Sequence, residues 1–190
     1  MFNILGVAFI AAFFAVIAAT VLIKRLGGTN IMVLGKKDKR ELLFGIGYLA
    51  LLYVILSNAT ALPMPDFINR FFWDSDIARM IGVALCAIGI AGFIVCVANF
   101  WKSVRIGVDY ENAGKLTTDG IYAVSRNPMY VCFNIIFFGE FLLFPNIGML
   151  CACIIAVASF HIQILKEEKF LKPHYGEDYD EYCKNVRRYL

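Results

Sequence analysis

The stretch "SRNPMYVCFN", Ser125 to Asn134, places an arginine, an asparagine and a proline directly before a long apolar run. Asparagine followed by proline is typical of a helix start, with Asn127 in the capping position and Pro128 as the first helical residue. The apolar run continues over residues 129–144. The pattern therefore predicts a helix that begins at a polar surface and enters an apolar environment.

A second apolar run follows this helix almost at once. It covers residues 147–165 and is separated from the first run only by Pro145-Asn146, a dipeptide typical of turns. Helices joined by so short a connection are usually antiparallel neighbours. We therefore expect residues 129–165 to form a helical hairpin.

The composition of the chain places it in a lipid bilayer. Of its 190 residues, 60% are hydrophobic and 17% are charged, which lies well outside the composition of a soluble domain. A helix that crosses the hydrocarbon core needs roughly 20 apolar residues. Three further stretches satisfy this requirement: residues 2–23, 42–62 and 81–101. The sequence predicts an all-α integral membrane protein with about five transmembrane helices in a single membrane domain, residues 1–190, whose N-terminal part, residues 1–101, holds three of them.

The distribution of charge predicts the orientation in the membrane. The loop between the first two spans contains one acid, Asp38, against six basic residues: Lys24, Arg25, Lys36, Lys37, Lys39 and Arg40. The next loop, residues 63–76, is acidic overall. Because basic loops are retained in the cytoplasm, we expect the N-terminus outside and the C-terminus in the cytoplasm. Residues 102–126 and those after Lys166 would then share the cytoplasmic face.

Two sets of polar or reactive residues fall inside the expected spans. Five of the six cysteines do so, and none forms a CxxC pair, so the sequence favours helix packing over a metal site or disulfides. Glu140 lies about 18 Å along a helix that starts at Pro128, near the middle of the bilayer. A charge there costs about 2.5–3.5 kcal/mol or more, so Glu140 is expected to face the helix bundle, protonated or paired. His161 on the neighbouring span is a candidate partner.

Polar side chains gather again after the last span. If that helix continues past Leu165, Gln163 and Glu167 lie on one face of it, with Leu171 one turn further on. Aromatic and apolar residues then recur at steps of three and four with charged residues between them: Tyr175, Tyr179, Tyr182, Val186 and Tyr189. This spacing predicts an amphipathic helix at the membrane surface, either as a plain anchor or as a lid over a cytoplasmic cavity.

Two quoted segments resemble a known family when they are taken together. "LTTDGIYAVSRNPMYV" followed by "EEKFLKPHYGEDYDEYCKNVRRY" resembles the isoprenylcysteine carboxyl methyltransferase family and its small bacterial and archaeal relatives. The resemblance rests on a Gly-x-Tyr turn, the Arg-Asn-Pro-x-Tyr helix start, a Glu-Glu pair and a tyrosine-rich tail, in family order over about the last 75 residues. It implies an S-adenosylmethionine-dependent methyltransferase that modifies a lipophilic acceptor in the membrane.

The resemblance also implies where the methyl donor binds. Residues 102–190 would form the cofactor-binding region, with the C-terminal helix covering a cytoplasmic pocket. The implied contacts to S-adenosyl-L-methionine come from Lys115, Leu116, Thr117, Tyr122, Asn127, Pro128, Met129, Tyr130 and Glu167. On the acceptor side the candidates for catalysis are Glu168 and Gln163, with Glu168, Glu140 and His161 as possible bases if the acceptor is an amine. No metal is implied.

Two departures from the family pattern leave the acceptor open. Asn127 replaces a histidine of the prenylcysteine enzymes, and Gln163 stands where they use an arginine thought to meet the substrate carboxylate. The loss of that arginine weakens the case for a C-terminal prenylcysteine as the acceptor, and another lipophilic amine, thiol or carboxylate is equally plausible. Nothing in the sequence indicates a nucleic acid or an obligate protein partner.

Two other classes of function compete with a methyltransferase. An NADPH-dependent membrane reductase of the sterol or enone type resembles these enzymes in its C-terminal helices. Its cofactor would require more basic residues around the helix start than Lys115 and Arg126 provide. A non-enzymatic membrane scaffold or carrier would account for the spans and for Glu140, but not for the ordered acidic and tyrosine-rich motifs.

Overall fold

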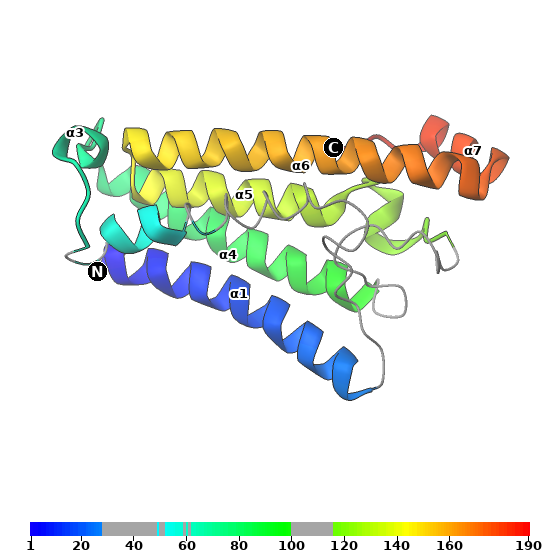
Figure 1. The fold of residues 1–190 in the computed structure, drawn as a ribbon, viewed down its shortest axis with the longest axis horizontal. Helices are drawn as coiled ribbons and strands as arrows, with labels where there is room; N and C mark the ends of the chain where they lie inside the picture. Colours follow the sequence, from blue (N-terminus) through cyan, green and yellow to red (C-terminus); the bar gives the residue numbers. More distant parts are fainter. Residues whose placement is uncertain (28–48, 50–51, 59, 61, 100–115) are drawn as a thin grey trace.

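The computed structural model describes residues 1–27, 49, 52–58, 60, 62–99 and 116–190 of the chain. The described part is helical and contains no β-strand, only an isolated bridge between Phe71 and Asn146. The helices are α1 (Phe2–Leu26), α3 (Asp66–Asn69), α4 (Asp76–Asn99), α5 (Pro128–Leu143), α6 (Ile147–Tyr175) and α7 (Glu177–Asn185), with a 3-10 turn η1 (Gly120–Ala123) before α5. Helices α1, α4, α5 and α6 run side by side along the long axis, and α1 diverges from the others toward its C-terminal end (Figure 1).

Three of these helices are long and apolar enough to cross a membrane. They are α1, α4 and α6, and they confirm three of the predicted spans. Helix α5 is apolar but has 16 residues, about 24 Å of helix, which is less than the hydrocarbon thickness. Of the predicted span at residues 42–62, the structure describes a helical part at residues 52–58, and the rest lies outside the described residues. The total of five spans therefore stays a prediction.

The closest packing in the bundle joins α4 to α5 through small residues. A Cβ atom added at Gly139 would lie 2.6 Å from the Sγ of Cys86 and 2.8 Å from the carbonyl oxygen of Gly82. At Gly89 an added Cβ would lie 3.0 Å from the carbonyl oxygen of Cys132. Cys86 and Cys132 are buried at this interface, which confirms that they serve helix packing. In the absence of a hydrophobic driving force between helices in lipid, such close backbone approach is a main source of association.

Aromatic rings fill the space where four helices meet. The ring of Phe13 on α1 lies 5.1 Å from that of Phe133 on α5, and Phe93 on α4 lies 5.0 Å from Phe133. Phe160 on α6 stacks on Phe137 at 5.7 Å, with the ring planes 7° apart. These centroid distances are those of favourable aromatic pairs. Aromatic rings thus lie between α5 and α6, whereas small residues allow α4 to pack directly against α5.

The predicted hairpin is confirmed, and its turn is tightly held. The side chain of Asn146 accepts a hydrogen bond from the backbone N–H of Met149 at 2.8 Å and so caps α6. Its amide nitrogen donates to Oδ1 of Asn58 at 2.6 Å and to Oδ1 of Asn69 at 3.3 Å. A single buried side chain thus ties the turn to residues 52–58 and to α3.

Glu140 faces the bundle, as expected, but its expected partner is wrong. The side chain is fully buried, and one carboxyl oxygen lies 4.0 Å from the Sγ of Cys86. A Cβ added at Gly6 of α1 would come within 3.1 Å of the other oxygen. His161 instead lies on the outside of α6, where its Nδ1 is 2.7 Å from the hydroxyl of Tyr189. His161 directly follows the buried Phe160, and successive residues of a helix point about 100° apart, so the side chain of His161 points away from the core that contains Glu140.

A Gly139→Ala substitution should destabilise the bundle. The added methyl group has no room between Cys86 and Gly82, so α4 and α5 must separate, at a cost of about 1–3 kcal/mol. Thermal unfolding of the detergent-purified protein should show a lower midpoint. The control is Gly27→Ala, where an added Cβ meets its nearest atoms at an ordinary 3.5 Å. Equal midpoints for the two variants would contradict the close α4–α5 contact.

Candidate functional site

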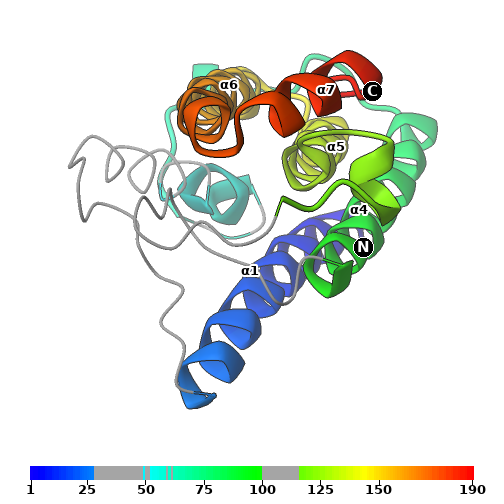
Figure 2. The same ribbon diagram turned by 90° about the vertical axis from the view of Figure 1, so that its right-hand side faces the viewer.

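A cluster of polar side chains lies at the open end of the α5–α6 hairpin. Because α5 begins and α6 ends there, the start of one helix lies beside the last turns of the other. Seen from that end, α7 runs from α6 across α5, and the C-terminus lies close by (Figure 2). Three segments distant in the sequence therefore meet: residues 125–130, residues 163–168 and the C-terminal residues 186–190.

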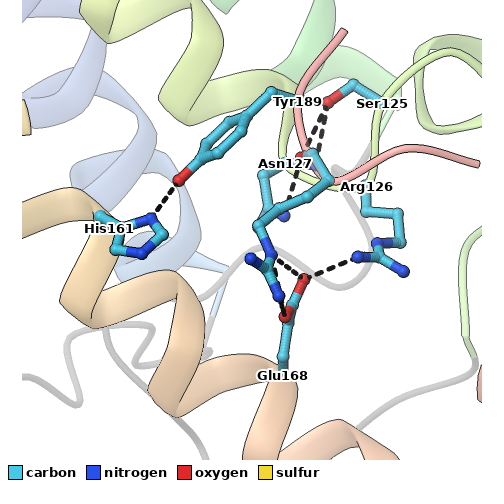
Figure 3. Close-up of polar contacts among 7 residues, drawn as sticks. Ser125, Arg126, Asn127, His161, Glu168 and Tyr189 are labelled. Atoms are coloured by element: carbon cyan, nitrogen blue, oxygen red, sulfur yellow. Dashed lines mark hydrogen bonds and ion pairs between the residues drawn. The ribbon is translucent and has the colours of Figure 1, made fainter. Parts of the chain in front are cut away.

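Asn127 occupies the N-cap position of α5, as predicted, but its side chain does not cap the helix. Pro128 does occupy the first turn of the helix, and the carbonyl oxygen of Asn127 accepts a hydrogen bond from the backbone N–H of Val131 at 3.2 Å, but the side chain of Asn127 accepts none from the helix. The side-chain nitrogen of Asn127 instead donates to the carbonyl oxygen of Arg188 at 3.1 Å (Figure 3). The backbone N–H of Arg126 donates to the carbonyl oxygen of Arg187 at 2.9 Å. Asn127 is used to bind the C-terminal segment because that segment lies within reach of its side chain.

Glu168 joins the same two segments through charge. Its carboxylate accepts hydrogen bonds from Nε and Nη2 of Arg188, at 3.0 Å and 2.7 Å, and from Nη2 of Arg126 at 3.1 Å (Figure 3). The side chains of Glu168 and Arg126 are 15% and 11% exposed, so both charges are largely removed from water. The hydrogen bond to Glu168 raises the pKa of Arg188 further above its usual value. This geometry is that of a two-sided ionic clamp.

Glu167 forms a second cluster next to this clamp. Its Oε1 accepts hydrogen bonds from the hydroxyl of Tyr130 at 2.7 Å and from Nε2 of Gln163 at 3.1 Å. The predicted stacking of Gln163 and Glu167 on one face of α6 is thereby confirmed. Gln163 is buried, and Tyr130 reaches across from the first turn of α5. Neighbouring glutamates on α6 thus bind different parts of the chain.

Tyr122 is hydrogen-bonded to a residue of α7. It is buried in η1, and its carbonyl oxygen accepts a hydrogen bond from the hydroxyl of Tyr182 at 2.7 Å. Leu116 and Thr117 are half-buried in the segment that leads into η1, and Met129 is half-buried in the first turn of α5. The side chains of these three residues make no hydrogen bond to Glu167 or Glu168. Lys115 lies outside the described residues.

The sequence predicted one continuous amphipathic helix for the C-terminal tyrosines, and this prediction is wrong. Helix α6 ends at Tyr175, Gly176 adopts a positive φ of 54°, and α7 covers Glu177–Asn185. The last five residues form a non-helical segment. Tyr179 and Tyr182 belong to α7 and are its buried residues. A positive φ is not helical and is strained for residues other than glycine, so Gly176 can end α6 at this point. The break lets α7 fold back over the site.

Arg126, Arg188 and Ser125 belong to the site and were missed as functional residues by sequence reasoning. The hydroxyl of Ser125 accepts a hydrogen bond from the backbone N–H of Asn127 at 3.1 Å and lies 3.4 Å from the carbonyl oxygen of Arg188. The sequence signal was present, since Arg126 precedes the Asn-Pro pair and Arg188 ends the tyrosine-rich motif. No spacing rule connects residues 62 positions apart, so their meeting at Glu168 could not be inferred.

The fold and the polar cluster together define the class of protein. The chain is a helical membrane protein whose polar cluster lies at the end of a helical hairpin under a folded-back C-terminal segment. The model of the phospholipid methyltransferase family (PEMT) matches residues 77–178, more than half of the chain, and the chain belongs to this family. The expected relationship to the isoprenylcysteine carboxyl methyltransferases is confirmed, and the protein is a membrane methyltransferase.

The relatives carry names that agree with this assignment. A probable protein-S-isoprenylcysteine O-methyltransferase of Oryza sativa subsp. indica is 28% identical over 142 residues, 73% of this chain and 72% of the relative. Protein-S-isoprenylcysteine O-methyltransferase A of Arabidopsis thaliana is 28% identical over 139 residues, 73% and 70% of the two chains. The Schizosaccharomyces pombe protein-S-isoprenylcysteine O-methyltransferase is 38% identical over 72 residues, 37% of this chain and 30% of the relative.

A Glu168→Gln substitution should loosen the C-terminal segment. The neutral side chain keeps the shape but leaves two guanidinium groups without their counter-charge, so we expect a loss of about 2–3 kcal/mol. Hydrogen exchange should accelerate at the backbone N–H of Arg126, which is bonded to the C-terminal segment. The control is Asp180→Asn, which breaks an exposed 3.2 Å pair with Lys172 and should cost about 0–1 kcal/mol. Unchanged exchange at Arg126 would show that Glu168 does not hold this segment.

The attachment of α7 should weaken at alkaline pH. Burial raises the pKa of Tyr182 to about 12, against about 10 in an unfolded chain. The protonated hydroxyl is therefore favoured in the folded state, and its contribution to stability is fully present below about pH 10 and is lost as the pH rises toward 12. Denaturant unfolding at several pH values should show this loss. In Tyr182→Phe the loss between pH 10 and 12 should be smaller, and equal losses in the two proteins would contradict the assignment.

Proposed function

We propose that the protein is an S-adenosylmethionine-dependent methyltransferase that modifies a lipophilic acceptor at the cytoplasmic face of the membrane. The observation that carries the proposal is the cluster of Glu167, Tyr130 and Gln163 at the start of α5, inside a family of methyltransferases. The cytoplasmic location rests on the basic loop at residues 24–40, which the positive-inside rule assigns to the cytoplasm.

The residues at this end of the hairpin suit the parts of S-adenosylmethionine. Its amino group and ribose diol call for an acidic oxygen, which Glu167 supplies. Its carboxylate calls for a helix N-terminus, and α5 offers one that no side chain of the described residues caps. Its sulfonium and adenine favour aromatic faces, and we assign Tyr130 and Tyr122 to this role. The uncapped first turn of α5 follows directly from the use of Asn127 to bind Arg188.

The protein's part in the reaction is mainly to hold two reactants in line. The methyl donor supplies an electrophilic methyl group on a sulfonium, and a carboxylate or thiolate acceptor is already nucleophilic. Positioning of this kind can supply about 7–11 kcal/mol of the barrier. Tyr130 and Glu167 would hold the donor side, and α7 with the C-terminal segment would exclude water. We assign Glu168 to positioning, because its oxygens already accept hydrogen bonds from two arginines.

The acceptor is proposed as a class. The relatives named above are protein-S-isoprenylcysteine O-methyltransferases, which favours an acceptor with a long apolar chain. At the position where those enzymes are thought to use an arginine, this chain has Gln163, so the group that is methylated can be a carboxylate, a thiol or an amine. An NADPH-dependent reductase is not favoured, since the family match is to methyltransferases.

Binding of S-adenosylmethionine and of NADPH to the detergent-purified protein, measured side by side by calorimetry, tests the proposal. We expect S-adenosylmethionine to bind and NADPH not to bind. Glu167→Gln should weaken S-adenosylmethionine binding at least about tenfold, because the carboxylate loses its charge while the side chain keeps its shape. The unfolding midpoint should change little.

The matched control is Glu181→Gln, which removes the same charge from the exposed face of α7 and should leave the affinity unchanged. Unaltered affinity in Glu167→Gln would remove that residue from the site. Binding of NADPH alone would overturn the assignment of the methyl donor.

A further inference from the structure

The facing sides of α5 and α6 are in a register that can be read from three contacts. Tyr130 meets Glu167 at the open end of the hairpin, and Phe137 stacks on Phe160 deeper in the bundle. Deeper still, the Sγ of Cys153 donates to the carbonyl oxygen of Phe137 at 3.2 Å. The two helices are therefore antiparallel, and each turn of α5 lies opposite a known turn of α6.

Two amide side chains occupy the turn between the first two of these contacts. Asn134 lies one turn beyond Tyr130 on α5 and three residues before Phe137, so it is on the side that faces α6. Gln163 lies one turn before Glu167 and three residues after Phe160, so it faces α5. The two amides thus share one level of the α5–α6 seam, one turn deeper than Glu167.

Both amides present a buried oxygen that has no hydrogen-bond partner within the described part of the chain. These atoms are Oδ1 of Asn134 and Oε1 of Gln163. Gln163 as a whole is 7% exposed. Its orientation is settled by its other end, since Nε2 must donate to the carboxylate oxygen of Glu167. Buried acceptors without donors are rare because they lose their bonds to water and gain nothing in return.

The chain around these oxygens is suited to an apolar group. The rings of Phe133, Phe137 and Phe160 border the same level, and Tyr130 packs on Phe160 at 5.4 Å. Helix α5 packs far more closely against α4 than against α6. The seam between α5 and α6 is thus the more easily parted side of α5, and it is lined by aromatic rings with two hydrogen-bond acceptors among them.

We infer that Asn134 and Gln163 form an acceptor-binding subsite that recognises N–H or O–H groups on a lipophilic molecule. The amide oxygens would each accept a hydrogen bond, and the aromatic rings would contact the apolar chain. A deprotonated carboxylate has no hydrogen to donate to either amide oxygen, so it would leave both of them unsatisfied. This inference rests on the proposed function and narrows its substrate class to acceptors that carry such donors beside the group to be methylated.

Two matched pairs of probes test the inference with the full chain in lipid nanodiscs. Oleylamine and oleyltrimethylammonium have the same charge, but only the first carries N–H donors. Oleyl alcohol and oleyl methyl ether are both neutral, and only the first carries an O–H donor. Ligand-induced shifts of the unfolding midpoint should be larger for the donor in each pair. Equal shifts within both pairs would overturn the inference.

Variants separate a ligand site from a structural role. In Asn134→Leu and in Gln163→Met the affinity for oleyl alcohol should fall at least about fivefold. The unfolding midpoint of ligand-free Asn134→Leu should stay level or rise, because an unsatisfied buried oxygen is removed. A marked fall in that midpoint would show that the oxygen serves the fold and would contradict the subsite. Asn185→Leu at the exposed end of α7 is the control and should leave the affinity for oleyl alcohol unchanged.

S-adenosylmethionine binding separates a failure of the subsite from a failure of the proposed function. If S-adenosylmethionine binds Asn134→Leu normally and the probe pairs still shift the wild type alike, the subsite is wrong and the proposed function stands. If S-adenosylmethionine does not bind the wild type, the proposed function fails, and the probe pairs still decide whether the two amides recognise donors.

Discussion

The turn between α5 and α6 is the constraint on which the polar site depends. Asn146 caps α6 and hydrogen-bonds Asn58 and Asn69, so the relative positions of the two helices are set at the closed end of the hairpin. With that register given, the first turn of α5 must meet the turns of α6 around residue 167. A shift of one residue at the turn would rotate Gln163 and Glu167 away from Tyr130, since successive residues of a helix point about 100° apart.

The C-terminal segment completes the site by means of charge. In lipid the apolar surfaces of the helices have no reason to gather the last five residues, which carry two arginines. Glu168 supplies that reason, because it neutralises Arg188 and Arg126 together at a place with little water. The same arrangement takes Asn127 away from capping and leaves the N-terminal end of α5 able to meet an anion. A structural clamp and a binding surface are therefore made by neighbouring side chains.

Many of the helices and part of the site could be predicted from short-range sequence patterns. The apolar runs predicted α1, α4 and α6, and the Asn-Pro pair predicted the start of α5. The four-residue spacing of Gln163 and Glu167 predicted their shared face. What failed were statements about where a polar side chain finds its partner, as with His161 and Glu140, because such partners come from elements far apart in the sequence. The single helix predicted through Tyr175 and Tyr189 was also wrong, because the positive φ of Gly176 ends α6 and separates it from α7.

The sequence by itself determined the membrane class, the hairpin and the family, because hydrophobicity, helix period and motif order are properties of neighbouring residues. Only the tertiary structure decided that Glu168 binds two arginines 62 positions apart and that Asn127 holds the C-terminal segment. It also decided that two amide oxygens find no donor among the residues that the structure describes. These outcomes depend on which helix faces which and at what level. That arrangement results from the small-residue contact of α4 with α5 and from the ring-lined contact of α5 with α6, and no local pattern records either.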